Sequence, residues 1–256
     1  MNSSRRYFLK VAGLSTFALA AGAAKAEAAE ATYEAYPEAK KAKRWAMVID
    51  TRRFKTPESV NAIMEACHKE HNVPCKPGPK EVKWIWDDTF EHAFADDPNP
   101  ILPKDIEERR FLLLCNHCTN PSCVRVCPAG ATYKVDGGIV AIDYHRCVGC
   151  RFCMAACPYT GVRSFNWETP QYYSEVGFGD WDVPAHVKHT VEKCTFCYQL
   201  ISRGEKPACM RLCPGRARFW GDLDDPDSEV SVKLRQYPSK QLLPEKGTRP
   251  KVYYLV

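Results

Sequence analysis

A chain of 256 residues with 45% hydrophobic content can hold one or two small domains. Its formal net charge is +5, and residues 1–26 supply four of the cations and no acid, so the remainder carries +1. That balance argues against a nucleic-acid partner. Fourteen cysteines are far more than ordinary usage, which makes the cysteine motifs the first place to look for function.

The first 26 residues have the anatomy of an export signal. They combine a basic start, an apolar stretch at 11–24 and an A-x-A site at 24–26. The run SRRYFLK at 4–10 resembles a twin-arginine signal, which implies export of a chain already folded around its cofactor. We therefore expect a periplasmic mature chain starting near Glu27. An uncleaved membrane anchor is the alternative, although the apolar stretch is short for a span.

The next part of the chain predicts a linker, a strand, a helix and an insertion. Residues 27–43 are rich in small residues and are typical of a linker. RWAMVID at 44–50 predicts a strand, and apolar spacing predicts an amphipathic helix over 59–69. Residues 74–110, rich in Pro, Trp and acid, are expected to be an insertion. No apolar run after residue 26 approaches the roughly 20 residues of a membrane span, so membrane contact is expected only through a partner.

Three cysteine-rich loops follow, separated by strand-like segments. FLLL at 111–114 predicts a strand before the first loop, and ATYKV and GGIVAID predict a hairpin around Asp136. The second loop follows directly, and a second insertion is expected at 167–189. RARFWGD at 216–222 predicts a strand after the third loop, and 226–256 is expected to be a C-terminal tail.

All three loops end in the pattern C-x3-C-P. The densest, CVGCRFCMAACP at 147–158, follows a spacing in which three thiolates bind one [4Fe-4S] cluster and the fourth ligates its neighbour. CNHCTNPSCVRVCP at 115–128 repeats it with two extra residues, and CTFC at 194–197 with CMRLCP at 209–214 spreads it over a longer gap. Zinc is the alternative, but structural zinc sites usually use two ligand pairs separated by a dozen or more residues.

A fourth loop has lost most of its cysteines. Counting back from Cys67 by the same rule gives Pro57, Val60 and Ile63 where thiolates should stand, so this loop cannot hold its own cluster. Because paired loops exchange their fourth cysteine, Cys67 is expected to complete the cluster of the third loop. The exchange predicts three [4Fe-4S] clusters, with Cys115, Cys118, Cys123 and Cys157 in set A, Cys147, Cys150, Cys153 and Cys127 in set B, and Cys194, Cys197, Cys209 and Cys67 in set C.

Some ligand assignments have alternatives. Cys213 could replace Cys67 as the fourth ligand of set C, in which case Cys67 is a buried helix cysteine that behaves as a small hydrophobe. Cys75 matches nothing in the pattern and is expected to be an incidental thiol. His117 and His145, within or beside the loops, could hydrogen-bond cluster sulfur, but a role in loop packing is favoured.

The loop pairing predicts an α+β fold of two bacterial 2[4Fe-4S] ferredoxin-like modules, one inserted in the other. The inner module is expected at 111–166. The halves of the outer module are expected at 44–73, which contains the degenerate loop, and at 190–225.

At this point the sequence resembles a known family. The order of the motifs, the long gap between Cys197 and Cys209 and the sequence IDTRR are similar to the four-cluster ferredoxin subunits that serve molybdopterin oxidoreductases and quinone-linked membrane complexes. Within that family, LCNHCTNPSCVRVCP, CVGCRFCMAACPY and GTRPKVYYLV resemble the periplasmic iron-sulfur subunits of Dsr-type membrane redox complexes, and the likeness covers essentially the whole chain.

The resemblance implies electron transfer beside an NrfD-type integral membrane subunit, with a multihaem cytochrome c or another redox subunit, in sulfate reduction or sulfur oxidation. The alternative within the family is the small iron-sulfur subunit of a molybdopterin oxidoreductase for polysulfide, sulfoxide or nitrite. Those relatives generally keep all four clusters.

Two classes of function fit the motifs. An electron relay needs no substrate site and no catalytic residue, because the protein only spaces the clusters and tunes their potentials. An enzyme would need a cluster with an iron that lacks a cysteine ligand, and the exchange fills every such position. We therefore expect an electron-transfer subunit of an oxidoreductase complex.

Overall fold

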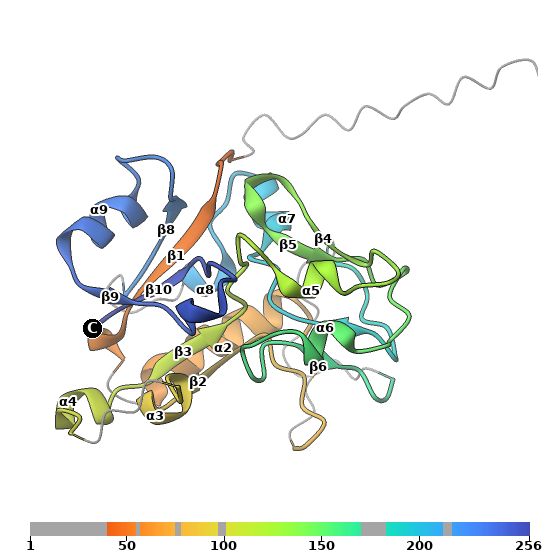
Figure 1. The fold of residues 1–256 in the computed structure, drawn as a ribbon, viewed down its shortest axis with the longest axis horizontal. Helices are drawn as coiled ribbons and strands as arrows, with labels where there is room; N and C mark the ends of the chain where they lie inside the picture. The colour runs from red at the N-terminus through yellow and green to blue at the C-terminus, as the bar shows by residue number, and fades with distance from the viewer. Residues whose placement is uncertain (1–39, 55–56, 75–77, 97–100, 170–182, 212–216) are drawn as a thin grey trace, which may run out of the picture. The chain divides into compact units, whose positions relative to one another are not determined.

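Strands far apart in the sequence pair around one central strand. The computed structural model describes residues 40–54, 57–74, 78–96, 101–169, 183–211 and 217–256 (Figure 1). The strands are β1 (Trp45–Asp50), β2 (Ile85–Asp88), β3 (Phe111–Leu114), β4 (Thr132–Lys134), β5 (Val140–Ile142), β6 (Ser164–Phe165), β7 (Val191–Glu192), β8 (Arg218–Asp222), β9 (Ser239–Lys240) and β10 (Val252–Leu255).

Short helices lie between the strands, so the described residues form an α+β fold. The helices are α2 (Glu58–Glu70), α3 (Phe90–Ala93), α4 (Lys104–Glu107), α5 (Ser122–Arg125), α6 (Phe152–Ala155), α7 (Tyr198–Ser202), α8 (Ala208–Arg211) and α9 (Glu229–Gln236), with 3-10 turns at Thr51–Arg53, Asp136–Gly138 and Pro244–Lys246. None of the helices in the described ranges combines the length and the apolar character that crossing a bilayer requires.

β1 is the second strand of a four-stranded sheet in the order β8-β1-β10-β9. It pairs antiparallel with β8 and parallel with β10, so that Met47 lies opposite Trp220 on one side and Val252 on the other. All six of its residues are buried, as expected for an apolar strand covered on both faces. Residues 226–256, expected to be a tail, instead supply β9, β10 and the helix α9, because the apolar strand VYYL gains from burial beside β1.

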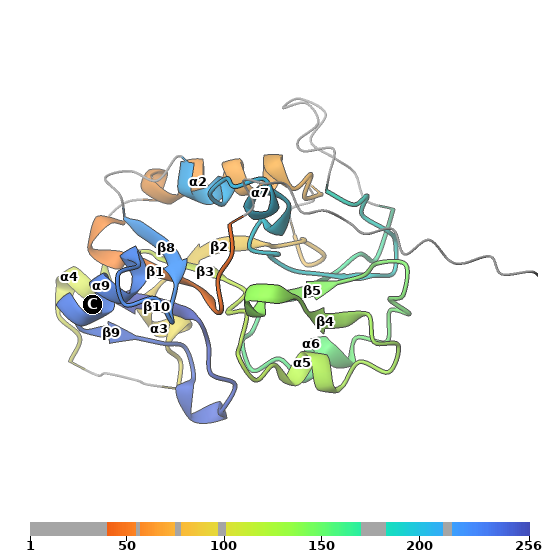
Figure 2. The same ribbon diagram turned by 90° about the horizontal axis from the view of Figure 1, so that it is seen from above.

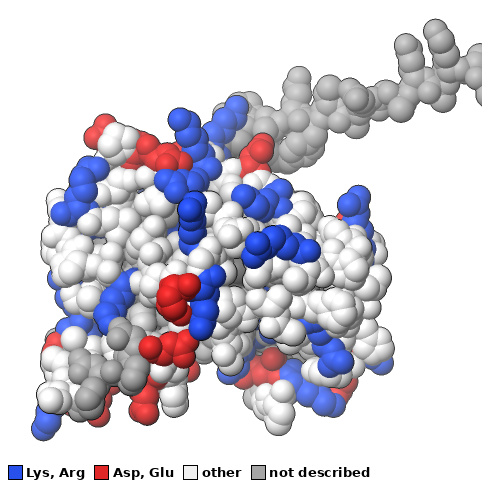
Figure 3. All heavy atoms as spheres, viewed as in Figure 1, with Lys and Arg blue, Asp and Glu red and all other residues white. Residues whose placement is uncertain are grey.

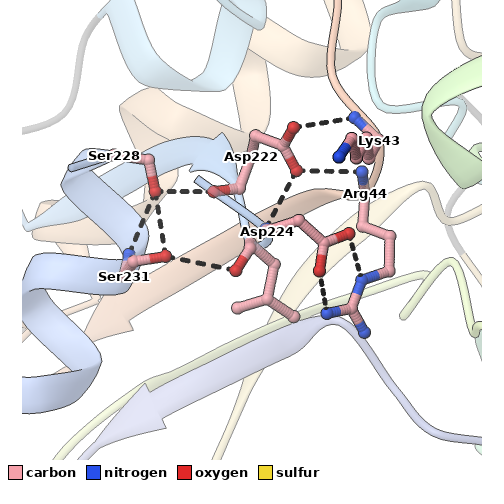
Figure 4. A network of polar contacts seen from close by, with 7 residues as sticks. Lys43, Arg44, Asp222, Asp224, Ser228 and Ser231 are labelled. Carbon is pink, nitrogen blue, oxygen red and sulfur yellow. Dashed lines mark hydrogen bonds and ion pairs between the residues drawn. The ribbon is translucent and has the colours of Figure 1, made fainter. Parts of the chain in front are cut away.

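A polar network fixes the start of β1 to the end of β8 and to α9 (Figure 4). The carboxylate of Asp222 accepts hydrogen bonds from the backbone N–H groups of Lys43 (2.7 Å) and Arg44 (3.0 Å). The Ser228 hydroxyl donates to the Asp222 carbonyl (2.6 Å) and accepts from the N–H of Ser231 (3.2 Å), which caps α9. The bonds from Lys43 and Arg44 to Asp222 join segments 179 and 178 residues apart in the chain.

α2 begins where the degenerate cysteine loop was expected. Val60, Ile63 and Cys67 lie on one face at helical spacing and all three are buried in the main core. α2 packs against α8, which brings 58–70 beside the third cysteine loop. At two of the three positions where a cysteine ligand is missing, an apolar side chain therefore fills the core. The backbone around these positions is helical and does not form a cluster loop.

The smaller pairings hold the first two cysteine loops. β2 pairs with β3, β4 with β5 as the predicted hairpin, and β6 with β7, all antiparallel. In both ribbon views β4 and β5 lie beside α5 and α6, on the other side of the domain from α9 (Figures 1 and 2). The strands predicted at 44–50, 111–114 and 216–222 and the helix predicted at 59–69 are confirmed to within a few residues.

Candidate metal centre

Set A comes from four places in the chain. Cys115 directly follows β3, Cys123 lies in α5, and Cys157 comes two residues after the end of α6. These three thiols and that of Cys118 line one hollow, hollow A, together with Tyr159 and Arg163. The structure thus gathers the four cysteines that the exchange of fourth ligands predicts, with Cys157 arriving from the neighbouring loop.

Set B combines three cysteines of the second loop with the last cysteine of the first loop. Cys127, Cys147, Cys150 and Cys153 line a second hollow, hollow B. α5 therefore carries Cys123 for set A and is followed by Cys127 for set B, while α6 carries Cys153 for set B and is followed by Cys157 for set A. Contact between these two short helices makes the crossed arrangement possible.

Set B is also the most open of the three. Cys150 is solvent-exposed, and two side chains that flank it in the loop, Val148 and Phe152, are 69% and 59% exposed. The thiol of Cys127 is close to the backbone of Ala129, Ala131 and Thr132. Burial alone would raise the pKa of Cys127, but hydrogen bonds from this backbone outweigh it and lower the pKa, which favours the thiolate.

Set C is fully inside the protein. Cys67 in α2, Cys194 after β7, Cys197 at the start of α7 and Cys209 in α8 are all buried. Burial, and then the neighbouring charges of Cys209, Cys197 and Cys194, raise the pKa of Cys67 well above its ordinary value. Among the described cysteines, Cys67 is therefore the one that lies beside Cys194, Cys197 and Cys209. Cys213 and Cys75 lie outside the described residues.

Hydrogen-bond donors point at the sulfurs of set C. The N–H of Phe196 donates to Cys194 Sγ and that of Ala208 to Cys197 Sγ, both at 3.4 Å. His71 Nε2 lies 3.0 Å from Cys197 Sγ, and Arg218 Nη2 donates to Cys209 Sγ at 2.9 Å. Donors around cysteine sulfurs are a feature of iron-sulfur sites, where they stabilise the charge on sulfur.

Three of the buried or partly buried thiols are poor acids without a metal. Burial raises the pKa of Cys118 to about 11 and the pKa of Cys157 and of Cys194 to about 12. These thiols are therefore protonated near neutral pH in the metal-free chain, and binding iron must release their protons. All twelve cysteines in the described ranges are free of disulfides.

The four thiols of set A, and likewise those of set B, surround a space instead of meeting at one point. Across the residues that the structure describes, no three His, Cys, Asp or Glu side chains converge closely enough to hold a single ion. Hollows A and B are each lined by four thiols, and a multi-iron cluster, whose irons each take one external thiolate, needs ligands spread in this way. The donor set therefore fits a cubane cluster.

The two histidines considered from the sequence differ in position. His117 is buried, stacks on Phe196 and accepts a hydrogen bond at Nδ1 from the N–H of Val140 (3.0 Å), so it packs the first loop. Burial lowers its pKa well below the ordinary value, and it is neutral. The side chain of His145 is 92% exposed and lies near Asp143, away from the hollows.

Buried cations are the feature that motif reasoning missed. On the face shown in Figure 3, Lys and Arg side chains are interspersed with Asp and Glu at the surface. Arg163, Lys193, Arg218 and Lys251 are instead at most 5% exposed. Each lies within six residues of a cysteine in the sequence or is brought close to one by the fold. The burial of a cation, however, cannot be predicted from sequence spacing.

No carboxylate accompanies these four cations among the described residues. Lys193 donates to the carbonyls of Val140 and Cys194, and Lys251 to that of Gly138. The hydrogen bonds of Arg218 to described residues go to the carbonyl and sulfur of Cys209 and to the sulfur of Met47. Isolated buried charges are costly, so each needs an anion nearby. A cluster bound by four thiolates is negatively charged and supplies that anion, which is a second way in which the residues fit the group.

The contacts between the sets give them an order. Cys123 of set A packs with Cys153 and Cys147 of set B, and the charges of Cys123 and Cys153 act on one another. On the other side, the charge of Cys115 in set A raises the pKa of Cys194 in set C, after burial. The sets therefore follow one another as B, A and C, from the surface at Cys150 to the interior.

Comparison with known proteins gives a consistent picture. A family model of the 4Fe-4S dicluster domain matches residues 109–173 and 181–223. The chain is 43% identical over 211 residues to a Halobacterium salinarum protein provisionally named as an iron-sulfur subunit of dimethyl sulfoxide reductase, covering 82% of this chain and 78% of that one.

Two relatives match over nearly the full length. A tetrathionate reductase subunit of Salmonella typhimurium is 36% identical, with 100% of this chain and 89% of that protein covered. The Hdr-like menaquinol oxidoreductase iron-sulfur subunit 1 of Archaeoglobus fulgidus is 38% identical, with 98% and 97% covered.

Proposed function

The chain belongs to the family of 4Fe-4S iron-sulfur subunits found in dimethyl sulfoxide reductase-type and Hdr-like oxidoreductase complexes, and we propose that it relays electrons through three [4Fe-4S] clusters. The observation that carries the number three is the gathering of twelve described cysteines into sets A, B and C. When bound, such clusters accept and release single electrons.

The protein's own residues do the remaining work of a relay. The contact between α5 and α6 keeps sets A and B adjacent. The burial of Cys115 and Cys194 keeps water out of the region between sets A and C. Exposed Cys150 gives a partner close access to set B, since few protein atoms separate it from solvent. This arrangement supports electron exchange with one partner at the set B end.

For the complex, we favour a Dsr-type membrane redox complex in dissimilatory sulfur metabolism, with this chain as its periplasmic subunit, DsrO. Support comes from the loss of the fourth cluster motif and from the full-length similarity to a relative named as a menaquinol oxidoreductase subunit. The proposed partners are an NrfD-type integral membrane subunit and a multihaem cytochrome c. A molybdopterin oxidoreductase is the second candidate, supported by the relatives named as dimethyl sulfoxide and tetrathionate reductase subunits.

Purification of the chain from its native membrane distinguishes the two candidates. Co-isolation of a cytochrome c and an NrfD-type membrane protein is expected. A molybdopterin subunit in stoichiometric amount would instead establish the second candidate.

The periplasmic location is a separate proposal that rests on SRRYFLK at 4–10. Changing Arg5 and Arg6 to Lys is expected to leave the precursor in the cytoplasm with its iron bound. Cell fractionation with iron analysis checks this, and continued export of the double variant would contradict a twin-arginine route.

The ligand proposal for set C has its own test. The wild-type chain is expected to bind about twelve irons. Cys67→Ser is expected to lose or convert one cluster, which holds about four of these irons. The matched variant Cys213→Ser should keep the full iron content. Iron analysis and electron paramagnetic resonance on both variants decide between the exchanged set and the local one, because the local set predicts the reverse pattern.

A further inference from the structure

Arg163 is a buried cation held at a fixed place between two sets of cysteines. It immediately precedes β6, whose Ser164 pairs with Glu192 of β7. The Ser164 hydroxyl also accepts a hydrogen bond from the N–H of Lys83 (2.8 Å). Arg163 itself is 5% exposed. The backbone on which the guanidinium is mounted is therefore tied to two other segments of the chain.

The guanidinium of Arg163 faces thiols of both sets. It lines hollow A beside Cys115, Cys118, Cys123 and Cys157. Cys123, which lines the same hollow, packs in one hydrophobic cluster with Cys153 and Cys147 of set B. Burial lowers the pKa of Arg163, and the charges of Cys123 in set A and Cys153 in set B oppose that effect most. One cation therefore acts on both sets.

The two terminal nitrogens of this side chain have hydrogen-bonding capacity to spare. Nη1 and Nη2 are buried and have no hydrogen-bond partner among the described residues. A buried guanidinium with unused donors is costly, and its planar fork can serve two acceptors on different sides. Sulfur atoms of clusters in hollows A and B are the acceptors that this position fits.

We propose that Arg163 is shared by the clusters of sets A and B and raises the reduction potential of both, an inference that rests on the three-cluster relay proposed above. Reduction adds one negative charge to a cluster, and a nearby buried cation favours that state at either site. Because the same charge serves both, Arg163 is a positioning and tuning residue for the step between set B and set A.

Arg218 provides a comparison within the same chain. Its Nη2 donates to Cys209 Sγ at 2.9 Å, and among the described cysteines its hydrogen bonds go to one of set C. Both arginines are buried cations beside thiols. They differ in the number of sets that each one touches, so their neutral variants should shift different numbers of potentials.

The test is a redox titration of the intact iron-loaded protein, followed by electron paramagnetic resonance. Arg163→Met is expected to lower two of the three midpoint potentials, and Arg218→Met only one. Arg125→Met removes an exposed charge in the loop between Cys123 and Cys127 and should leave all three unchanged, because water screens it. Arg163→Lys keeps the charge and should retain most of both potentials.

Other outcomes would overturn the inference. A shift of one potential or of none in Arg163→Met, with full iron content, means that the charge is not shared. If Arg163→Met loses iron, Arg163→Lys and Arg163→Gln carry the comparison, and equal potentials in those two variants contradict a role for the charge. Iron and sulfide analysis of the wild type tests the three-cluster proposal independently, since fewer than three clusters would be seen before any titration.

Discussion

At the scale of single residues, the second cysteine loop depends on Gly149. Its φ of +68° is in the left-handed region, and a Cβ at this position would lie 2.4 Å from the carbonyl oxygen of His189. Gly130, after Cys127, has a similar φ of +60° but nothing within 4 Å of the same position. Alanine substitutions at the two glycines therefore distinguish the energetic cost of the backbone conformation from that of a steric clash.

Gly149→Ala is therefore expected to destabilise the iron-loaded protein by on the order of 3 kcal/mol and to lose the iron of set B, because a backbone carbonyl cannot move aside easily. Gly130→Ala pays only the conformational cost of about 1 kcal/mol and should keep its iron. Thermal unfolding and iron analysis of the two variants check this. Equal behaviour of the pair would show that the contact with His189 does not matter.

At the scale of elements, α9 and the β1–β8 pair are joined by the polar network of Figure 4. Ser228 both caps α9 and bonds the carbonyl of Asp222, so a helix end and a strand end share one hydroxyl. Asp222 in turn collects backbone N–H groups from the chain that leads into β1. The polar side chains of Ser228 and Asp222 thus fix the edge of the sheet that carries Arg218.

Ser228→Ala removes the cap of α9 and is expected to lower the free energy of unfolding by about 1 kcal/mol, the usual cost of a lost N-cap. Ser239→Ala, at an exposed position in β9, is the matched control and should change stability little. Urea unfolding of both variants measures the difference. A similar loss in the two would mean that the Ser228 hydroxyl contributes nothing specific.

Asp222 should make stability depend on pH. Burial raises its pKa, but hydrogen bonds from the N–H groups of Lys43, Arg44 and Asp224 lower it by more, and the net direction is down. A carboxyl whose pKa is lower in the folded state stabilises the protein above its unfolded pKa of about 3.9, and that contribution is lost as the pH falls through the folded pKa.

Asp222→Asn is accordingly expected to cost about 1–2 kcal/mol at pH 7, with the difference from wild type shrinking below about pH 4. Unfolding of the two proteins at matched pH values tests the trend. A constant gap between Asp222→Asn and wild type at all pH values would contradict the assignment.

At the scale of the whole molecule, the interior is built around charge that the protein alone does not balance. In the part of the chain that the structure describes, four cations are buried near the cysteine sets, and the thiols of Cys118, Cys157 and Cys194 are protonated near neutral pH without iron. Iron-sulfur clusters both join distant segments of the chain and neutralise these cations. Folding and cluster binding should therefore be strongly coupled.

Removing iron with a chelator under reducing conditions is expected to lower the melting temperature sharply. The effect of Arg218→Met should change sign between the two states. In the loaded protein it removes a partner of set C and destabilises, on the order of 3 kcal/mol, whereas in the iron-free chain it removes an unpaired buried charge and stabilises by about 1 kcal/mol or more. Circular dichroism melts of both proteins in both states provide the measurement, and an effect of the same sign throughout would refute charge compensation.

The sequence by itself determined which cysteines come together in sets A and B and much of the secondary structure. The repeated spacing, with its exchange of fourth ligands, predicted the four thiols that line hollow A and the four that line hollow B, because ligand spacing is a local property of each loop. It also placed Cys67 with the third loop, 127 residues away from Cys194. The strands at 44–50 and 111–114 and the hairpin formed by 131–135 and 137–143 were predicted as well.

Only the tertiary structure decided what surrounds those cysteines. That Val60 and Ile63 fill the core, that β10 joins the sheet beside β1, and that Cys150 is open while set C is closed all depend on which surfaces meet. The same holds for Arg163 and Arg218, because nothing in the sequence around them distinguishes them from surface arginines. Burial and electrostatic environment arise from packing between distant segments, and a linear pattern of residue types does not contain them.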